Sequence, residues 1–149
     1  MHEREVKKIM NEVRGKKISI GEAIRKLKFM PFEDLGFAKI DHHRALRKGF
    51  PEVVFCQNKT VKQVMEIVKR LAKDNSTILA TRATEDMFRQ IKKHIKNTQY
   101  NTKSKTIIVN KKNKIKNNKK ILVASAGTSD INVAEEAAVV AEAMGNKVE

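Results

Sequence analysis

The stretch EVVFCQNKTVKQVMEIVKRLAKDNSTILAT, residues 52–81, decides the fold. It opens with a β-rich run at 52–56 and closes with a second such run at 77–81. Between the two runs, Thr60 is a typical helix N-cap. The apolar residues that follow it recur on one helical face, at Val61, Val64, Ile67, Val68 and Leu71. Strand, helix and strand in this order predict a βαβ unit with a parallel sheet, and therefore an α/β fold.

The N-terminal third of the chain predicts a helical hairpin and a short strand. Residues 6–13 carry apolar side chains at helical spacing, and Gly15 closes this pattern as a C-terminal signal. Ser19 is the expected cap of a second helix, which ends before Pro31. The apolar pattern in 36–44 is too short for a helix, so we expect a strand there, ahead of the βαβ unit.

The rest of the chain continues the alternation of strands and helices. Thr84 is the expected cap of the next helix, and 106–109 predicts a strand. After a stretch rich in lysine and asparagine, 120–124 predicts a buried strand. An alanine-rich helix over 133–144 and the start of another strand at 147–149 complete the pattern.

These elements predict three parts. Residues 1–110 form an N-terminal α/β domain with the helical hairpin, 111–119 form a basic linker, and 120–149 form the first strand-helix unit of a further domain. One strand and one helix leave a parallel sheet edge unpaired and an apolar helix face uncovered. We therefore expect the last part to be incomplete, either because the chain has been cut or because another chain completes it.

Composition excludes several classes of protein. No apolar run reaches the length of about 18 residues that a membrane-spanning helix needs, so we expect no membrane partner. The first residues, Met1-His-Glu-Arg-Glu5, lack the features of a signal peptide. The single cysteine, Cys56, excludes an internal disulfide and a cysteine-rich zinc module. Together these features predict a soluble, cytoplasmic protein.

The net charge of +15 is concentrated in one segment, because no acidic residue occurs between Lys103 and Lys120. Such a segment is typical of a solvated surface or of a nucleic-acid-binding stripe. Tyr100 is the one aromatic residue near it, whereas stacking of bases needs several. We favour the solvated surface and do not expect nucleic acid as a partner. A nucleic-acid-binding module using this segment is the alternative from another functional class.

The turn Ser125-Ala-Gly-Thr-Ser-Asp130 is the first candidate site. A strand that leads through small residues and hydroxyls into a helix brings free backbone N–H groups and the positive helix end together, which favours an anion. Gly127 would let the backbone approach a ligand, while Thr128 and Ser129 would donate to it and Asp130 would cap the helix or accept from a ribose hydroxyl. The alternative is that Ser129 or Asp130 is an ordinary N-cap, and the spacing does not decide between the two.

Two further groups are candidates for anion binding. Asp41-His-His-Arg44 is weak as a metal site, because on a strand alternate residues face opposite sides, and we expect no metal there. It fits an anion clamp, with Arg44 and Arg47 as donors and Asp41 orienting His42 or binding a ribose, or else a salt-bridged surface turn. Arg82 follows a strand at the usual position of ligand contacts, or pairs with the acids at the start of the next helix.

The sequence closely resembles a known family at four places. These are 41–55 (DHHRALRKGFPEVVF), Lys59-Thr60 opening a helix, Leu79-Ala-Thr-Arg82, and the Ser125 turn with the VAEEA that follows it. They resemble the pyridinium-3,5-biscarboxylic acid mononucleotide synthases, which help to build the nickel-pincer cofactor of lactate racemase. The family is also labelled phosphoribosylaminoimidazole carboxylase-related or circadian phase modifier. The resemblance runs from about Ser19 onward.

The resemblance implies a function for a longer protein. Family members carboxylate the pyridinium ring of nicotinic acid adenine dinucleotide, with CO2 or bicarbonate as co-substrate, and cleave its phosphoanhydride to release AMP. The last part of this chain would then begin a carboxylase-like, flavodoxin-like three-layer domain. Substrate-binding residues would be Asp41, His42, Arg44, Arg82, Ser125, Gly127, Thr128, Ser129 and Asp130. Related carboxylases form octamers, so a homo-oligomer is implied, and no cofactor is expected, although the involvement of magnesium stays open.

The same resemblance indicates what this chain lacks. In the related purine enzymes the loop reads Gly-Ser-x-Ser-Asp, so Ser129 and Asp130 carry over, while Gly127 stands where those enzymes have serine. The family's catalytic cysteine lies far downstream of this loop, and Cys56 does not match it. No catalytic residue is therefore expected in residues 1–149, which should be inactive alone. A regulatory paralogue that binds nucleotide without chemistry is a further alternative.

Overall fold

The computed structural model describes residues 3–28, 33–41, 44, 52–74, 77–111 and 119–149. The chain divides into two units, Met1–Phe50 and Pro51–Glu149, and each is described by itself. The predicted linker falls mostly on 112–118, outside the described residues, so the predicted domain boundaries stay predictions.

The first unit begins with the predicted helical hairpin. Helix α1 (Glu3–Arg14) and helix α2 (Ile20–Lys28) share a small apolar core around Ile9 and Ala23. The Ser19 hydroxyl accepts a hydrogen bond from the backbone N–H of Glu22 at 3.1 Å, which confirms the predicted cap. Helix α1 ends at Arg14, directly before Gly15 as predicted, and the left-handed residue that follows is Lys16, with φ 54°.

A two-stranded antiparallel sheet follows in the same unit. Strand β1 (Glu33–Asp34) pairs with β2 (Lys39–Ile40), so the predicted strand in 36–44 exists but is two residues long. It ends at Ile40 because the chain turns there, with the N–H of Arg44 donating to the carbonyl oxygen of Asp41 at 3.2 Å. Asp41 and Arg44 therefore do not lie on this strand, and His42 and His43 lie outside the described residues.

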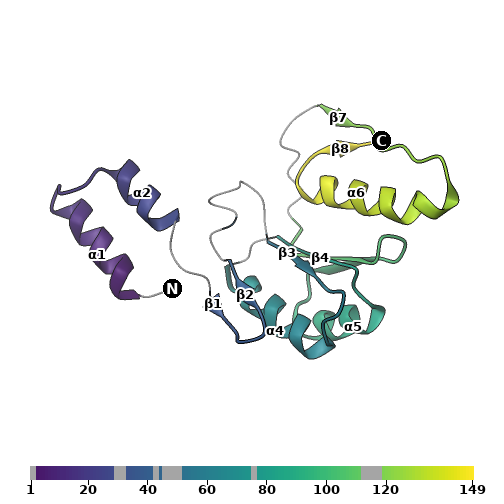
Figure 1. Cartoon of the computed structure of the whole chain (residues 1–149), viewed down its shortest axis with the longest axis horizontal. Coiled ribbons are helices and arrows are strands. Elements are labelled where there is room, and N and C mark those ends of the chain that lie inside the picture. The colour runs from purple at the N-terminus through teal and green to yellow at the C-terminus, as the bar shows by residue number, and fades with distance from the viewer. Residues whose placement is uncertain (1–2, 29–32, 42–43, 45–51, 75–76, 112–118) are drawn as a thin grey trace. The chain divides into compact units, whose positions relative to one another are not determined.

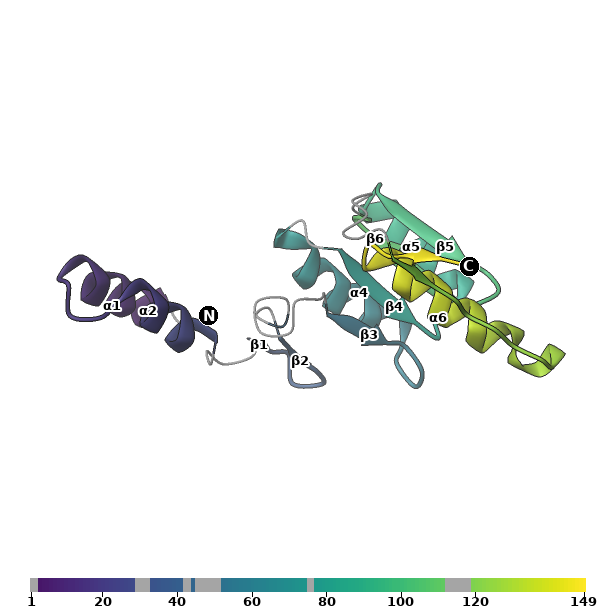
Figure 2. The ribbon, with the colours of Figure 1, turned by 90° about the horizontal axis from the view of Figure 1, so that it is seen from above.

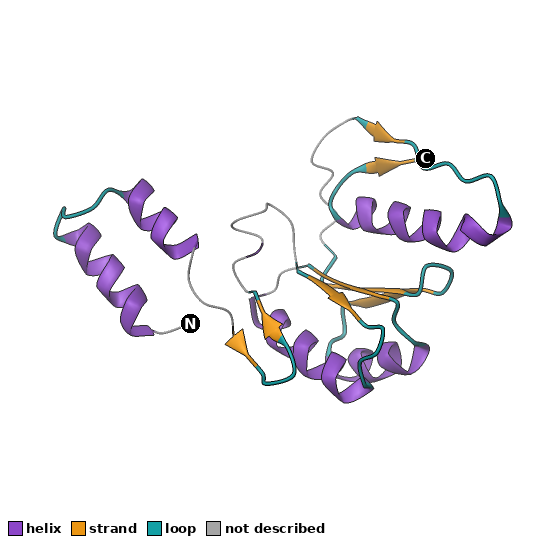
Figure 3. Cartoon of the chain, viewed as in Figure 1, coloured by secondary structure: helices purple, strands orange, loops and turns teal. Residues whose placement is uncertain are grey.

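The second unit contains the predicted βαβ core (Figures 1 and 3). Strands β3 (Val53–Phe55) and β4 (Ile78–Thr81) are parallel and flank helix α4 (Val61–Leu71) in the chain. A short 3-10 turn, η1 (Ala72–Asp74), follows α4, and helix α5 (Glu85–His94) follows β4. Both N-caps are confirmed, since Thr60 and Thr84 accept from the N–H groups of Gln63 and Met87. The α/β fold class is thus confirmed.

An antiparallel hairpin completes this sheet. Strand β5 (Thr98–Asn101) pairs with β6 (Thr106–Val109), which confirms the predicted strand and adds one that the sequence analysis missed. Strand β6 also pairs antiparallel with β4, which gives the order β3-β4-β6-β5. On one face of the sheet, the ring of Tyr100 stacks on Phe88 of α5 with centroids 5.3 Å apart. The same face is covered by α4 and α5 (Figure 1).

Helix α6 (Ile131–Ala143) lies on the opposite face of this sheet, crossing above β4 and β6 (Figures 1 and 2). Its Val139 and Ala143 pack against Leu79 and Ile108. We expected the apolar face of this helix to be uncovered. That expectation is wrong at Val139 and Ala143, because the four-stranded sheet β3-β4-β6-β5 covers them. None of the helices in the described part of the chain is long and apolar enough to span a membrane.

The C-terminal strands form a separate two-stranded parallel sheet. Strand β7 (Lys120–Ile121) pairs with β8 (Lys147–Val148), so both predicted strands exist, although their pairing was not predicted. The 3-10 turn η2 (Thr128–Asp130) leads into α6. The prediction of a buried strand at 120–124 is wrong in this structure, since both residues of β7 are exposed and Leu122 is 77 % exposed. Among the described residues, β7 pairs with β8 alone, so little packs around it.

Candidate functional site

The loops that follow β3 and β4 meet at one edge of the main sheet. Because these strands are parallel, their carboxyl ends lie side by side, and α4 and α5 both begin there. The N–H of Cys56 donates to the carbonyl oxygen of Thr81 at 2.9 Å. The N–H of Ala83 donates to the carbonyl oxygen of Lys105, in the β5–β6 turn, at 2.8 Å. This carboxyl edge is the usual ligand position in open α/β sheets.

Backbone strain is concentrated at the same edge. Positive φ angles occur at Asn58 (63°), Arg82 (55°) and Lys105 (51°), one in each of the three loops that meet there. For Arg82 and Lys105, a left-handed conformation costs about 1–2 kcal/mol each, because Cβ approaches the backbone carbonyl. Strain of this kind gathers at functional sites, where the surrounding structure maintains it.

Arg82 connects this edge to helix α6. Its Nε lies 3.2 Å from Oε2 of Glu136, and its side chain is 47 % exposed. The alternative that Arg82 pairs with the acids of the next helix is wrong, because Glu85 and Asp86 pair with Arg89 at 3.8 and 3.3 Å. The pairing with Glu136 bridges 54 positions in the sequence, so no local pattern predicts it.

The turn from Ser125 to Asp130 is exposed apart from a half-buried Gly127. Gly127 has φ −104° and ψ 152°, an extended conformation that any residue adopts, so the backbone does not require glycine there. Asp130 occupies the N-cap position of α6, but its side chain makes no capping hydrogen bond. The Ser129 hydroxyl donates to its Oδ1 at a long 3.5 Å. The side chain of Asp130 therefore has no capping function in this structure.

The structure connects two of the candidates, Arg82 and the Ser125 turn, to the same helix. Glu136, the partner of Arg82, lies five residues into α6, which corresponds to about 7–8 Å along the helix from Ile131. Arg82 and the Ser125 turn are thus both joined to the N-terminal half of α6. Asp41, which is buried, and Arg44 belong to the first unit, and His42 and Arg47 lie outside the described residues.

Comparison with known protein families identifies the family of this chain. The model of the LarB/PurE-like N-terminal domain matches residues 32–112. This chain belongs to that family. The match includes Asp41, His42, Arg44 and Arg82, while the Ser125 turn lies beyond it. The family is carboxylase-related and enzymatic in general.

One curated relative extends beyond this domain. An uncharacterized protein of Methanocaldococcus jannaschii is 36% identical over 135 residues, which are 86% of this chain and 53% of the relative. The chain therefore spans about half the length of the relative that it matches.

The cysteine of this LarB/PurE-like chain is unsuited to nucleophilic chemistry. Cys56 is buried at the end of β3, where its thiol lies 3.6 Å from the carbonyl oxygen of Val54. Burial raises the pKa of the thiol to about 11, although the nearby Lys59 acts in the opposite direction. A thiol that stays protonated at neutral pH is a poor nucleophile.

We expect Cys56 to resist a chromogenic disulfide reagent in the folded protein at about pH 8 and to react once the protein is unfolded. The raised pKa also affects stability. Because the folded value of about 11 exceeds the ordinary 9.0, this group stabilises the fold below pH 9, and the contribution is lost as the pH rises toward 11. Reaction of the folded protein as fast as that of the unfolded protein would contradict the burial of this thiol.

The described lysines of the basic segment do not form one continuous stripe. Lys111 pairs with Glu142 at 3.7 Å, and Lys120 pairs with Glu149. Lys103 and Lys105 lie in the β5–β6 turn, and 112–118 lie outside the described residues. Part of the positive charge is thus balanced by acids of the C-terminal segment, which reduces support for a nucleic-acid interface.

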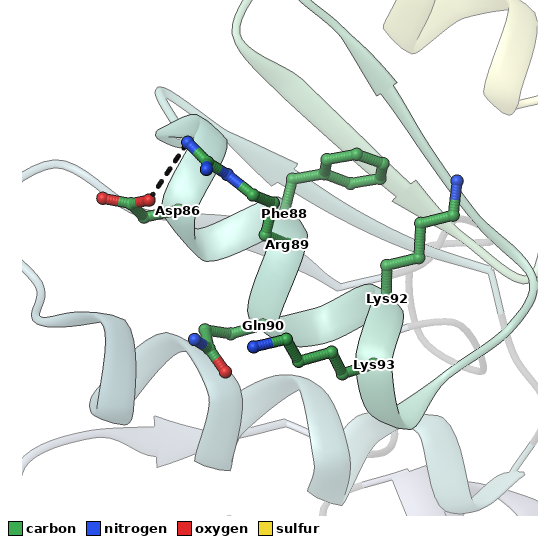
Figure 4. Close-up of a pocket in the computed structure, with 6 residues that line it drawn as sticks. All are labelled: Asp86, Phe88, Arg89, Gln90, Lys92 and Lys93. Atoms are coloured by element: carbon green, nitrogen blue, oxygen red, sulfur yellow. Dashed lines mark ion pairs between the residues drawn. The ribbon is translucent and has the colours of Figure 1, made fainter.

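A shallow surface hollow lies along α5 and is not part of the candidate site (Figure 4). All the residues that line it come from this helix: Asp86, Phe88, Arg89, Gln90, Lys92 and Lys93. Two of its charged side chains already have partners within the helix. Arg89 pairs with Asp86, and the Lys92 Nζ lies 5.2 Å from the Phe88 ring centre. In the described part of the chain, no three His, Cys, Asp or Glu residues lie close enough to hold a metal ion.

Proposed function

We propose that this chain is part of an enzyme that carboxylates the pyridinium ring of nicotinic acid adenine dinucleotide. The same enzyme cleaves the phosphoanhydride to release AMP, in the biosynthesis of a nickel-pincer cofactor. Membership of the LarB/PurE-like family supports a carboxylase-related function. The four motifs that resemble the synthases support this particular reaction.

The observation that carries the proposal is the position of Arg82. It lies at the carboxyl edge of the sheet and contacts α6, which begins directly after the Ser125 turn. The turn would bind one anionic group of the dinucleotide through backbone N–H groups and hydroxyls, and Arg82 would bind another. Asp130, which caps nothing, would accept a hydrogen bond from a ribose hydroxyl.

Carboxylation needs a nucleophile that this chain does not supply. A pyridinium ring is electron-poor, so a nucleophile must add to it before a neighbouring carbon can attack CO2. Cys56 is buried with a pKa of about 11 and cannot take this role. The cysteine of the family's carboxylase-like domain would supply it, and the present chain would bind and orient the substrate. A homo-oligomer and a cytoplasmic location are parts of the same proposal.

The reaction is tested by AMP release. Residues 1–149, incubated with the dinucleotide and labelled bicarbonate, should give neither AMP nor labelled product when the mixture is separated by chromatography. The same chain joined to the cysteine-bearing domain of a family member should give both. Turnover by residues 1–149 alone would refute the assignment of the nucleophile to another domain, and an inactive but folded fusion would refute the proposed reaction.

A further inference from the structure

Two cationic residues lie next to each other at the carboxyl edge. Arg82 directly follows β4, and Lys105 directly precedes β6, the antiparallel neighbour of β4. The hydrogen bond between the N–H of Ala83 and the carbonyl oxygen of Lys105 shows that the chains remain adjacent there. Two cationic residues on adjacent chain segments favour a ligand of negative charge.

The Arg82 guanidinium has N–H donors that its ion pair with Glu136 does not use. Among the described residues its one ionic contact is through Nε, to Glu136, and the side chain is about half exposed. A guanidinium has five N–H donors, arranged to fit phosphate or carboxylate oxygens. The Glu136 carboxylate thus occupies one side of a group that could bind a larger anion. Lys105 is exposed, and no described acid pairs with it.

The turn that carries Lys105 is also joined to α6. Ser104, just before Lys105, is 3 % exposed, so its hydroxyl is closed to solvent and takes no part in ligand binding. Its backbone N–H donates to Asn101 Oδ1 at 2.9 Å, and the amide of Asn101 donates to Glu135 at 2.6 Å. The edge is therefore joined to α6 through two consecutive carboxylates, those of Glu135 and Glu136.

We propose that Arg82 and Lys105 form a phosphate-binding site, and that Glu136 occupies it when no ligand is bound. The inference rests on the proposed function for the identity of the ligand, a phosphate group of the dinucleotide. A carboxylate and a phosphate both offer anionic oxygens to the N–H groups of an arginine, so the incoming phosphate displaces Glu136. The cost of this displacement is small, since an ion pair with both partners partly exposed stabilises the fold only weakly.

The test uses inorganic pyrophosphate as the probe, titrated into residues 1–149 at low ionic strength and followed by calorimetry. We expect R82Q and K105Q each to weaken binding by about fivefold or more, and E136Q to strengthen it by about fivefold, as for one unit charge close to the ligand in water. R89Q is the matched control, because Arg89 lies on α5 and pairs with Glu85 and Asp86. Circular dichroism of each variant checks that it is folded, and R82K provides a second variant that keeps the charge.

Two outcomes overturn the inference. Equal effects of R82Q and R89Q would show that pyrophosphate responds only to net charge, and an unchanged affinity of E136Q would show that Glu136 does not compete with the anion. A parallel titration with nicotinic acid adenine dinucleotide separates this inference from the proposed function. Pyrophosphate binding with the expected order of variants, but no dinucleotide binding, would retain the phosphate site and refute the proposed substrate.

Discussion

Replacing Leu79 with alanine is expected to lower the free energy of unfolding by about 3 kcal/mol, the usual cost of a cavity in a well-packed core. Leu79 is 0 % exposed and lies between β4 and α6, where it packs with Ile108, Val139 and Ala143. Removing its side chain therefore leaves a space between the sheet and the helix. Urea unfolding followed by circular dichroism measures the change.

The control for this variant is Leu122→Ala, at an exposed leucine of the C-terminal segment. It is expected to change the stability by less than about 0.5 kcal/mol, because little apolar surface is lost. If Leu79→Ala were as mild as the control, α6 would not cover the sheet. The contact of Arg82 with Glu136 would then lose its structural basis.

The substitutions Ser129→Ala and Asp130→Asn are each expected to weaken dinucleotide binding by about tenfold, the size of one hydrogen bond to a charged or phosphate group. Neither should lower stability, because the Asp130 side chain makes no capping bond to α6. Equilibrium dialysis measures the binding, and thermal unfolding measures the stability.

The matched control is Ser19→Ala. Its hydroxyl does cap α2, so the variant should lose about 1 kcal/mol of stability while dinucleotide binding stays unchanged. If Ser129→Ala and Asp130→Asn behaved like Ser19→Ala, with lower stability and unchanged binding, the Ser125 turn would be a helix start without a ligand.

Most helices and strands could be predicted because their signals are local. Thr60 and Thr84 each accept a hydrogen bond from the residue three positions later, so a few consecutive residues fix where α4 and α5 begin. Strand β5 was missed because its polar sequence, Thr98-Gln-Tyr-Asn101, has a weak strand signal of its own. It becomes a strand through pairing with β6.

Less of the candidate site than of the fold could be predicted from the sequence. The anion-binding role considered for Arg82 follows from its place after a strand, but its partner Glu136 depends on how α6 packs on the sheet. The left-handed backbone at Arg82 and Lys105 has no sequence signal, because glycine is the residue that usually indicates it. Asp41 was singled out as a ligand, and its burial comes from tertiary structure that alternation of residues does not reveal.

The most direct measurement is the binding of nicotinic acid adenine dinucleotide to residues 1–149, by equilibrium dialysis, beside a duplex DNA of mixed sequence. We expect saturable binding of the dinucleotide that R82Q weakens and R89Q does not. We also expect DNA to bind weakly and to dissociate as salt is raised, through charge alone. Absence of dinucleotide binding by the folded chain, or tighter and sequence-selective binding of DNA, would contradict the claim that this chain supplies a substrate site of a dinucleotide carboxylase.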